Sequence, residues 1–339
     1  MLYRLSYLGV RLPVTGRGSV TESGSADNAA GIRIGPEGFP GRVRNLAAIR
    51  SSLTSWLILA SATALLAQAG AAPTPVVRSP GNAEWASTLA EARARAASQQ
   101  KFVFVEFTQA QCGNCERMDH LLYPAFDFEA LLIPMVPIKL EIDSEVGKAL
   151  AARYEVRETP SVLITTPEGR LVFLMQGFRS APEFYAHAHS DLDAYRRFAR
   201  KVEGQDVSKL SGREALDTGR ELFQRQDSAA ALPRLERATR APDTTPEMHE
   251  DALELAAAAE LDLGKSAASS RTIEQLIATT KSSDRRERAE LFQAQIPLSE
   301  NKPAEALKRF EAFKRAHPQS AYMAGVDAMI QKLLDARSR

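Results

Sequence analysis

Cysteine is scarce in this chain, which has two, Cys112 and Cys115, among 339 residues. A structural zinc site normally needs four cysteine or histidine ligands, and the five histidines include no second close ligand pair of the zinc-finger type. Covalent haem attachment needs a histidine directly after the second cysteine, and position 116 is a glutamate. We therefore expect no metal and no cofactor.

The chain also lacks an excess of either charge, because its 43 Lys and Arg residues are balanced by 42 Asp and Glu residues, for a net charge of +1. Proteins that hold nucleic acid or anionic membranes electrostatically carry a clear basic excess. The balance gives no such case here, and we expect no nucleic-acid partner.

Charged residues are absent from positions 51–77, which have arginines on both sides and an apolar core at 56–67. The small residues Ala67-Gln68-Ala69 follow the core, as at a signal-peptidase site. We expect residues 42–71 to be a signal peptide and 72–81 a linker. The alternative is an uncleaved membrane anchor with the soluble domains outside the cytoplasm. No cysteine follows the core, which excludes a lipoprotein anchor, and the pattern predicts export to the periplasm.

Residues 1–41 do not fit this leader, because a signal peptide begins near its start codon. The segment is rich in Gly, Ser and Arg. We interpret it as a disordered extension, or as the result of a start assigned too early, with translation beginning near Val43 or Leu46.

The two cysteines stand one helical turn apart in Cys112-Gly113-Asn114-Cys115, shortly after an apolar run at 101–107. This spacing is typical of a redox pair, with a bound metal or inert thiols as the alternatives. If a helix begins at Gly113, its free amides and dipole favour a thiolate at Cys112. Cys112 is then the attacking thiol and Cys115 the resolving thiol. Gly113 and Asn114 add no positive charge, which argues against a strong oxidant.

Three segments, 104–115, 136–143 and 156–164, resemble the thioredoxin superfamily in order and approximate spacing. The motif followed by Arg117-Met118-Asp119 and later by 136–139 looks like the thioredoxin-like domains related to the reducing domains of disulfide-interchange proteins. The resemblance covers about residues 82–200. It implies an α/β thioredoxin-like sandwich domain over 82–203.

The resemblance also implies roles for two charged residues. Glu106 stands where thioredoxins place a buried acid that exchanges a proton with the resolving cysteine, and Lys139 resembles the partner of that acid. A carboxylate on an apolar strand is costly to bury unless it is paired, and burial raises its pKa. The alternative is that Glu106 points to solvent at a strand edge.

Substrate-binding positions follow from the same resemblance. Pro160 matches a cis-proline that faces the cysteines, which would leave the backbone of Thr159 free to pair with an extended substrate. The alternative is a trans proline that opens a strand. Gly113 and Asn114, inside the motif, are the other substrate-contacting positions that we expect.

Two departures from thioredoxin concern the motif itself. Gln111 replaces the tryptophan usually found before the first cysteine, and Asn114 replaces the proline inside the motif. The first change removes an apolar platform, and the second frees the local backbone. We therefore expect a dedicated partner rather than many substrates.

Hydrophobic periodicity and turn residues predict the remaining elements of this domain. We expect helices at 82–98, 112–122, 126–132, 145–154 and 181–202, and strands at 101–107, 135–142, 161–166 and 170–176. His187 and His189 are two residues apart in the last helix, so they point to different faces and are interpreted as surface residues.

Beyond residue 203 the strand signals fade, and breakers separate roughly seven amphipathic helices over 204–339. Ala231, Ser269 and Ala306 begin similar patterns 38 and 37 residues apart. The period resembles degenerate tetratricopeptide repeats, which stack into an all-α domain with a concave surface that commonly binds proteins. The alternative is a helical extension with no partner.

Together these patterns predict an exported thiol-disulfide oxidoreductase, more a reductase than a strong oxidase. Its partners would be protein thiols and disulfides, a redox partner that supplies or accepts electrons, and a protein on the helical repeats. The alternative hypothesis is a protein-binding module that uses the repeats, with the thioredoxin-like domain as a scaffold or redox switch.

Overall fold

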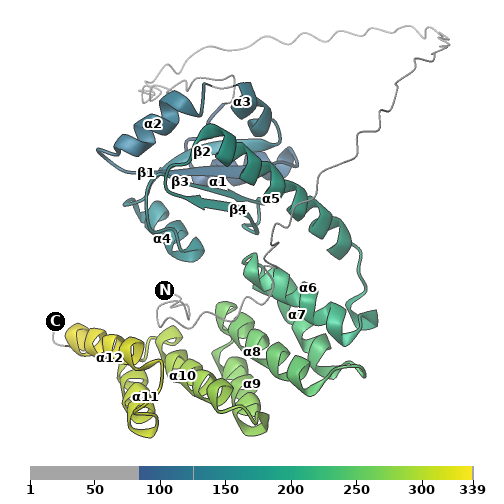
Figure 1. Ribbon diagram of the computed structural model, residues 1–339, viewed down its shortest axis with the longest axis vertical. Coiled ribbons are helices and arrows are strands. Elements are labelled where there is room, and N and C mark those ends of the chain that lie inside the picture. The colour runs from purple at the N-terminus through teal and green to yellow at the C-terminus, as the bar shows by residue number, and fades with distance from the viewer. Residues whose placement is uncertain (1–83, 125, 338–339) are drawn as a thin grey trace, which may run out of the picture. The chain divides into compact units, whose positions relative to one another are not determined.

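A computed structural model describes residues 84–124 and 126–337, and the predicted leader, linker and N-terminal extension lie outside this range. A four-stranded sheet with five helices forms the first part (Figure 1). In chain order its elements are α1 (Leu89–Ser98), β1 (Phe102–Thr108), α2 (Gly113–Leu121), α3 (Phe126–Leu132), β2 (Met135–Glu141), α4 (Glu145–Tyr154), β3 (Ser161–Thr165), β4 (Leu171–Gln176) and α5 (Ala181–Val202).

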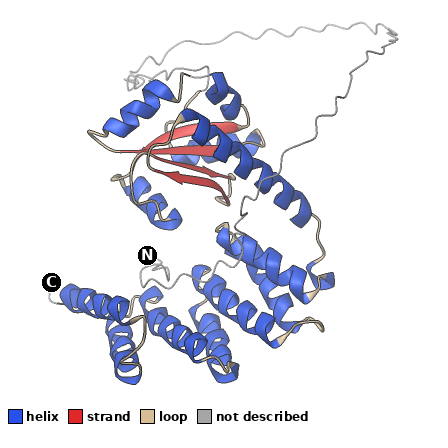
Figure 2. Cartoon of the chain, viewed as in Figure 1, coloured by secondary structure: helices blue, strands red, loops and turns tan. Residues whose placement is uncertain are grey.

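The second part is helical throughout (Figure 2). It consists of the short 3₁₀ helix η2 (Val207–Lys209) and then α6 (Gly212–Gln224), α7 (Ser228–Arg240), α8 (Pro246–Asp262), α9 (Ser266–Thr279), α10 (Ser283–Ser299), α11 (Pro303–Ala316) and α12 (Met323–Arg337). The expectation of an α/β sandwich followed by an all-α region of roughly seven helices is confirmed. None of the helices in residues 84–124 and 126–337 is long and apolar enough to cross a bilayer.

The sheet has the strand order β2-β1-β3-β4, with β1 parallel to β2 and antiparallel to β3. Both faces are covered. One core joins Phe104 of β1 to α2, α3 and α5, and the other joins Val103 and Val105 to α1 and α4. This explains why β1 reads as a nearly continuous apolar run rather than an alternating one. Glu106 shares the face of Phe104, because side chains two apart in a strand lie on the same side.

The first helix is shorter than predicted, because α1 begins at Leu89 and not at residue 82. Thr88 has an extended backbone, and its side chain accepts a hydrogen bond from the Glu91 N–H, which is the geometry of an N-cap. Trp85 is therefore not part of an amphipathic helix face. Its ring instead contacts Phe104, with centroids 6.2 Å apart, and Tyr123, at 5.9 Å.

The repeat pattern coincides with burial in the helical region. Ala231, Ser269 and Ala306 lie in α7, α9 and α11, and each is fully buried. The apolar positions that follow them four residues later, Leu235, Ile273 and Phe310, are buried too. The period of 37 to 38 residues is thus the spacing of every second helix, as in stacked helix pairs.

Helix α5 contributes to the core on the α2 and α3 face of the sheet and also to a core of the helical region. Phe184 and Leu192 pack with the sheet, whereas Phe198, nearer the end of the helix, belongs to the cluster of α6, α7 and α8. The core of the helical region thus includes a residue before the predicted domain boundary between residues 203 and 204. That boundary stays a prediction.

Candidate active site

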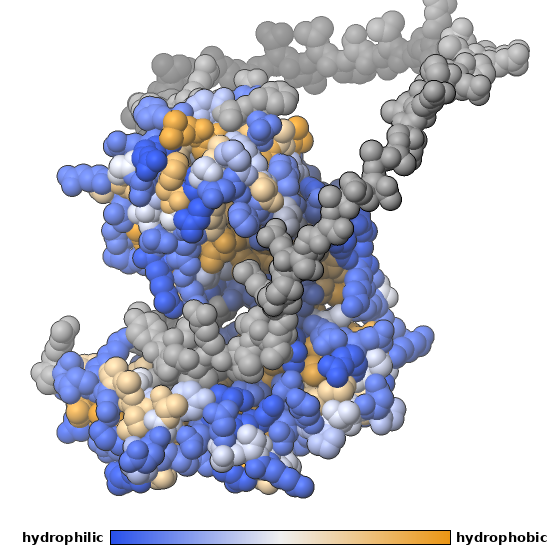
Figure 3. Space-filling view, viewed as in Figure 1, coloured by the Kyte–Doolittle hydropathy of each residue, from blue (hydrophilic) through white to orange (hydrophobic). Residues whose placement is uncertain are grey.

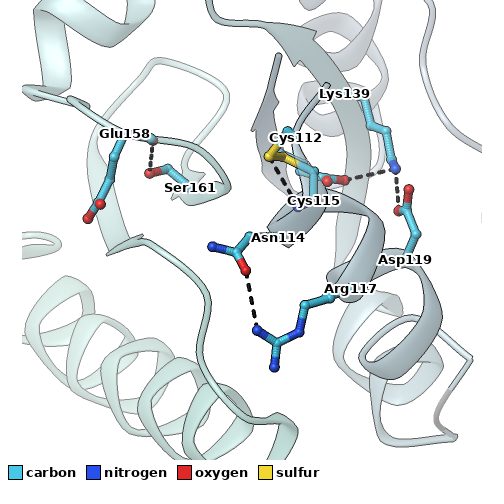
Figure 4. Close-up of a disulfide and its surroundings, with 9 residues drawn as sticks. Cys112, Asn114, Cys115, Arg117, Asp119, Lys139, Glu158 and Ser161 are labelled. Atoms are coloured by element: carbon cyan, nitrogen blue, oxygen red, sulfur yellow. Dashed lines mark hydrogen bonds and ion pairs between the residues drawn. A yellow bond between two sulfur atoms is a disulfide. The ribbon is translucent and has the colours of Figure 1, made fainter. Parts of the chain in front are cut away.

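The two cysteines form a disulfide at the start of α2 (Figure 4). Cys112 is the N-cap of that helix, and its Sγ accepts a hydrogen bond from the Cys115 N–H at 3.1 Å. Cys112 is 9% exposed and Cys115 is 5% exposed. The helix start that the sequence predicts is therefore present, and the cysteine at the helix N-terminus is the slightly more exposed residue of the two. A thiolate there would be stabilised by the unpaired amides of the first turn.

The two residues between the cysteines lie at the surface. Gly113 and Asn114 are both exposed, and a Cβ added at Gly113 would meet no atom within 4 Å. The Asn114 Oδ1 accepts a hydrogen bond of 3.3 Å from Nη1 of Arg117. The motif is thus open to solvent at Gly113 and held on its outer side by Arg117.

Glu106 is completely buried, which rules out the alternative of an exposed side chain at a strand edge. The register of β1 with β2 places it directly opposite Lys139, whose Nζ lies 3.3 Å from its Oε2. The positive charge of Lys139 and, to a smaller extent, the hydroxyl of Tyr123 both favour the ionised form of Glu106. Burial raises the pKa of Glu106 to about 7, because the attraction of Lys139 offsets only part of the desolvation.

Lys139 also binds a second carboxylate, and more closely. Its Nζ lies 2.5 Å from Oδ1 of Asp119, which is one turn beyond Cys115 on α2 (Figure 4). Burial lowers the pKa of Lys139, but the charge of Glu106 and the contact with Asp119 outweigh this and leave it raised. The amine therefore stays protonated and links the helix of the motif to the buried acid.

Two aromatic rings complete the surroundings of Lys139. Its Nζ lies 5.2 Å from the ring centroid of Tyr123 and 5.6 Å from that of Trp85, within the range of cation–π contacts. Burial, and then the charge of Glu106, raise the pKa of the Tyr123 hydroxyl well above its usual range. Sequence reasoning missed these aromatics and Asp119. The spacing of four residues from Cys115 to Asp119 was the available signal, because it places both on one face of α2.

The loop before β3 holds the predicted substrate-binding pair. The Thr159–Pro160 peptide bond is cis, the isomer that the resemblance implies. Pro160 is buried, and Ser161 donates a hydrogen bond from Oγ to the Glu158 carbonyl at 2.6 Å. The roles of Thr159 and Pro160 in substrate binding stay predictions.

Metal-binding geometry is not found in the part of the chain that the structure describes, which holds no group of three or more His, Cys, Asp or Glu side chains suited to an ion. His187 and His189 are both exposed on α5.

Sequence comparison agrees with this geometry over the same segment. Residues 89–190 match the family model described as a thioredoxin-like domain. This segment is a thioredoxin-like domain. Curated relatives include a protein disulfide-isomerase of Datisca glomerata, 30% identical over 89 residues, which are 25% of this chain and 17% of that protein. A protein disulfide-isomerase of Ricinus communis is 25% identical over 126 residues, 36% of this chain and 22% of its own length. The chain thus spans about a fifth of the length of these relatives.

Solved structures are similar over about a third of the chain. A thioredoxin from Thermus thermophilus is 27% identical, with 30% of this chain and 80% of that chain covered and a TM-score of 0.28. The DsbH oxidoreductase is 19% identical, with 34% and 88% covered and a TM-score of 0.29. The oxidised C-terminal domain of DsbD from Neisseria meningitidis is 17% identical, with 29% and 88% covered and a TM-score of 0.26.

Proposed function

We propose that this protein is an exported thiol-disulfide oxidoreductase that reduces disulfides of partner proteins. The observation that carries the proposal is the Cys112–Cys115 disulfide at a helix N-terminus, in the same domain as a buried acid with a pKa near neutrality. The chemistry is a two-electron exchange. The Cys112 thiolate attacks one sulfur of the partner's disulfide, and the other sulfur leaves as a thiolate, so that a mixed disulfide forms.

The second step releases the partner. The Cys115 thiol loses its proton, attacks Sγ of Cys112, and displaces as a thiolate the partner sulfur that was bound to Cys112. The partner has then gained two electrons, and the Cys112–Cys115 disulfide has formed. A dithiol donor must reduce this disulfide before the next cycle.

Glu106 is the proton acceptor for Cys115 in this proposal. A general base works best when its pKa lies near the working pH, and burial brings Glu106 to about 7. Lys139 stabilises the carboxylate form through its charge at 3.3 Å. Cys115 is a buried residue, so a base within the protein serves it better than bulk water.

The reducing direction is supported by the residues of the motif. Gly113 and Asn114 bring no positive side chain to Cys112, whereas a strong oxidant needs a highly stabilised thiolate. Export is supported by the uncharged segment 51–77 and its small-residue site. The helical repeats bind the partner protein in this scheme. The regular burial of Ala231, Ser269 and Ala306 supports the stacking of the helices that such a surface requires.

The reduction potential of the Cys112–Cys115 pair tests the proposal. The protein is equilibrated in thiol buffers of defined potential, and the fraction of disulfide is measured by alkylation and mass spectrometry. We expect a value near that of thioredoxin, about −270 mV, whereas a value near about −120 mV would indicate a disulfide donor. If no reversible disulfide forms, the enzymatic proposal fails and the binding-module hypothesis replaces it.

Trapping identifies which sulfur attacks. In a Cys115→Ser variant the mixed disulfide on Cys112 cannot be resolved, so partner proteins accumulate in covalent complexes. A Cys112→Ser variant leaves only the more buried sulfur, and we expect no such complexes. Equal trapping by both variants would contradict the assignment of Cys112 as the nucleophile.

A further inference from the structure

Arg117 is held in a fixed position beside the cysteine motif. Its guanidinium Cζ lies 4.3 Å from the ring centroid of Phe178, in the segment between β4 and α5, which is a close cation–π contact. Its Nη1 donates to Asn114 Oδ1 at 3.3 Å. Figure 4 shows Asn114 between the disulfide and Arg117. Two elements far apart in the sequence therefore fix one arginine at the rim of the motif.

The charge of Arg117 is left uncompensated by this arrangement. Among the described residues no carboxylate oxygen lies within 4.0 Å of its guanidinium. Lys139, by contrast, contacts both Asp119 and Glu106. A guanidinium has five N–H donors, and the Asn114 contact accounts for one of them. Arg117 is also exposed, so the remaining donors can reach a bound molecule.

The geometry of the opening favours a ligand on this side of the motif. A Cβ at Gly113 would meet no atom within 4 Å, so a partner chain has room beside Cys112. Glu158, an acidic side chain of the loop before Pro160, points its carboxylate away from the disulfide in Figure 4. A partner that approaches Cys112 past Asn114 therefore passes beside the positive charge of Arg117 (Figure 4).

We propose that Arg117 determines specificity by binding a carboxylate that the partner carries next to its reacting cysteine. The inference rests on the proposed function and adds the class of substrate: a disulfide flanked by aspartate or glutamate. Because Phe178 and Asn114 already restrict the arginine, less side-chain entropy is lost when the carboxylate binds. A guanidinium also matches a carboxylate with two parallel hydrogen bonds.

Peptide disulfides that differ in one flanking residue test this inference. Three synthetic peptides carry a single cysteine, oxidised to the disulfide dimer, next to aspartate, serine or lysine. The reduced full-length protein is mixed with each peptide at low salt, and second-order rate constants are measured by acid quenching and mass spectrometry. We expect the order aspartate, serine, lysine from fastest to slowest. The ratio of aspartate to lysine should fall about five-fold in Arg117→Gln.

Two further variants sharpen the result. Arg117→Lys keeps the charge but loses the planar fork and the stacking on Phe178, so it should retain only part of the preference. Arg196→Gln, a control on the exposed surface of α5, should not change the ratio. Because each ratio is measured within one variant, partial unfolding cancels. Equal rates for the three peptides in the wild-type protein, or an unchanged ratio in Arg117→Gln, would overturn the inference while the proposed function stands. If the wild-type protein reduced none of the three peptides, both the inference and the proposed function would be overturned.

Discussion

Glu106 and Lys139 face each other at one register position of the parallel strands β1 and β2, with Nζ and Oε2 3.3 Å apart. The pKa of Glu106 is nevertheless raised to about 7, since its burial outweighs the attraction of the lysine. A carboxyl group whose pKa is higher in the folded than in the unfolded protein binds more protons when folded. The contribution of Glu106 to the free energy of unfolding must then fall as the pH rises from about 4.5 to about 7, and level off above this range.

This relation predicts the pH dependence of stability. Relative to a Glu106→Gln variant, the wild-type protein should lose about 3 kcal/mol of unfolding free energy between pH 4.5 and pH 8, because the pKa is raised from 4.5 to about 7. Urea titrations of both proteins at several pH values measure the difference. Parallel pH curves for the two proteins would show that Glu106 titrates normally.

The same carboxyl group should control the release of the partner. We expect Glu106→Gln to slow the attack of Cys115 on the mixed disulfide at least about 100-fold near pH 7, since a positioned base contributes on the order of 10² to 10⁴ in rate. In the wild-type protein the rate should rise through pH 7 as Glu106 loses its proton, and the variant should lack this step. Single-turnover experiments with a preformed mixed disulfide measure both.

Glu116→Gln is the matched control for this experiment. Glu116 is an exposed carboxylate on the first turn of α2, next to Cys115 in sequence. Its removal changes the local charge without touching the buried acid. A similar slowing in both variants would mean that charge near the motif, rather than proton transfer to Glu106, sets the rate.

Asp119 should raise the pKa of Glu106. It lies closer to the shared Lys139 Nζ, at 2.5 Å, and adds a negative charge that disfavours ionisation of the buried acid. In Asp119→Asn we therefore expect the pKa of Glu106 to fall below about 7, which a carboxyl ¹³C NMR titration measures directly. Glu129→Gln, an exposed change on α3, serves as the control. An unchanged or higher value in Asp119→Asn would contradict this electrostatic relation.

The sequence was sufficient for the features that depend on local pattern. The start of α2 at the motif, the helix α5 and the burial period of Ala231, Ser269 and Ala306 follow from spacing and breakers alone. The surroundings of Lys139 could not be predicted in this way, because they depend on how separate elements approach each other. Tertiary geometry determines how closely the Lys139 amine approaches each of the two carboxylates, Glu106 and Asp119. Sequence periodicity carries no information about these distances.

Trp85 illustrates a second limit. Its spacing from Leu89, Ala92 and Ala96 suits one helix face, and the helix was predicted to include it. The N-cap hydrogen bond of Thr88 competes with that extension, so the helix begins only at Leu89. The indole is thereby free to pack on Phe104, from where it contacts Lys139. A single side-chain hydrogen bond thus decided whether this ring belongs to a helix or to the site.

Gly219 should be far less tolerant of alanine than Gly113. A Cβ at Gly219 in α6 would lie 2.9 Å from Cγ and Cδ2 of Leu235 and 3.2 Å from its backbone nitrogen. The leucine tip could rotate, but the backbone of α7 would have to move, at a cost of about 1–3 kcal/mol. A Cβ at Gly113, the first residue of α2, meets nothing within 4 Å, so Gly113→Ala should cost no packing energy.

Urea unfolding followed by far-ultraviolet circular dichroism measures both variants. We expect a lower midpoint for Gly219→Ala and an unchanged or higher one for Gly113→Ala. Because Leu235 occupies a buried position of the repeat, the loss should appear in the unfolding of the helical region. In Gly219→Ala the oxidation state of Cys112 and Cys115 should respond to thiol buffers as in the wild-type protein. Equal midpoints for the two variants would show that α6 and α7 can separate without cost, against the close approach that Gly219 permits.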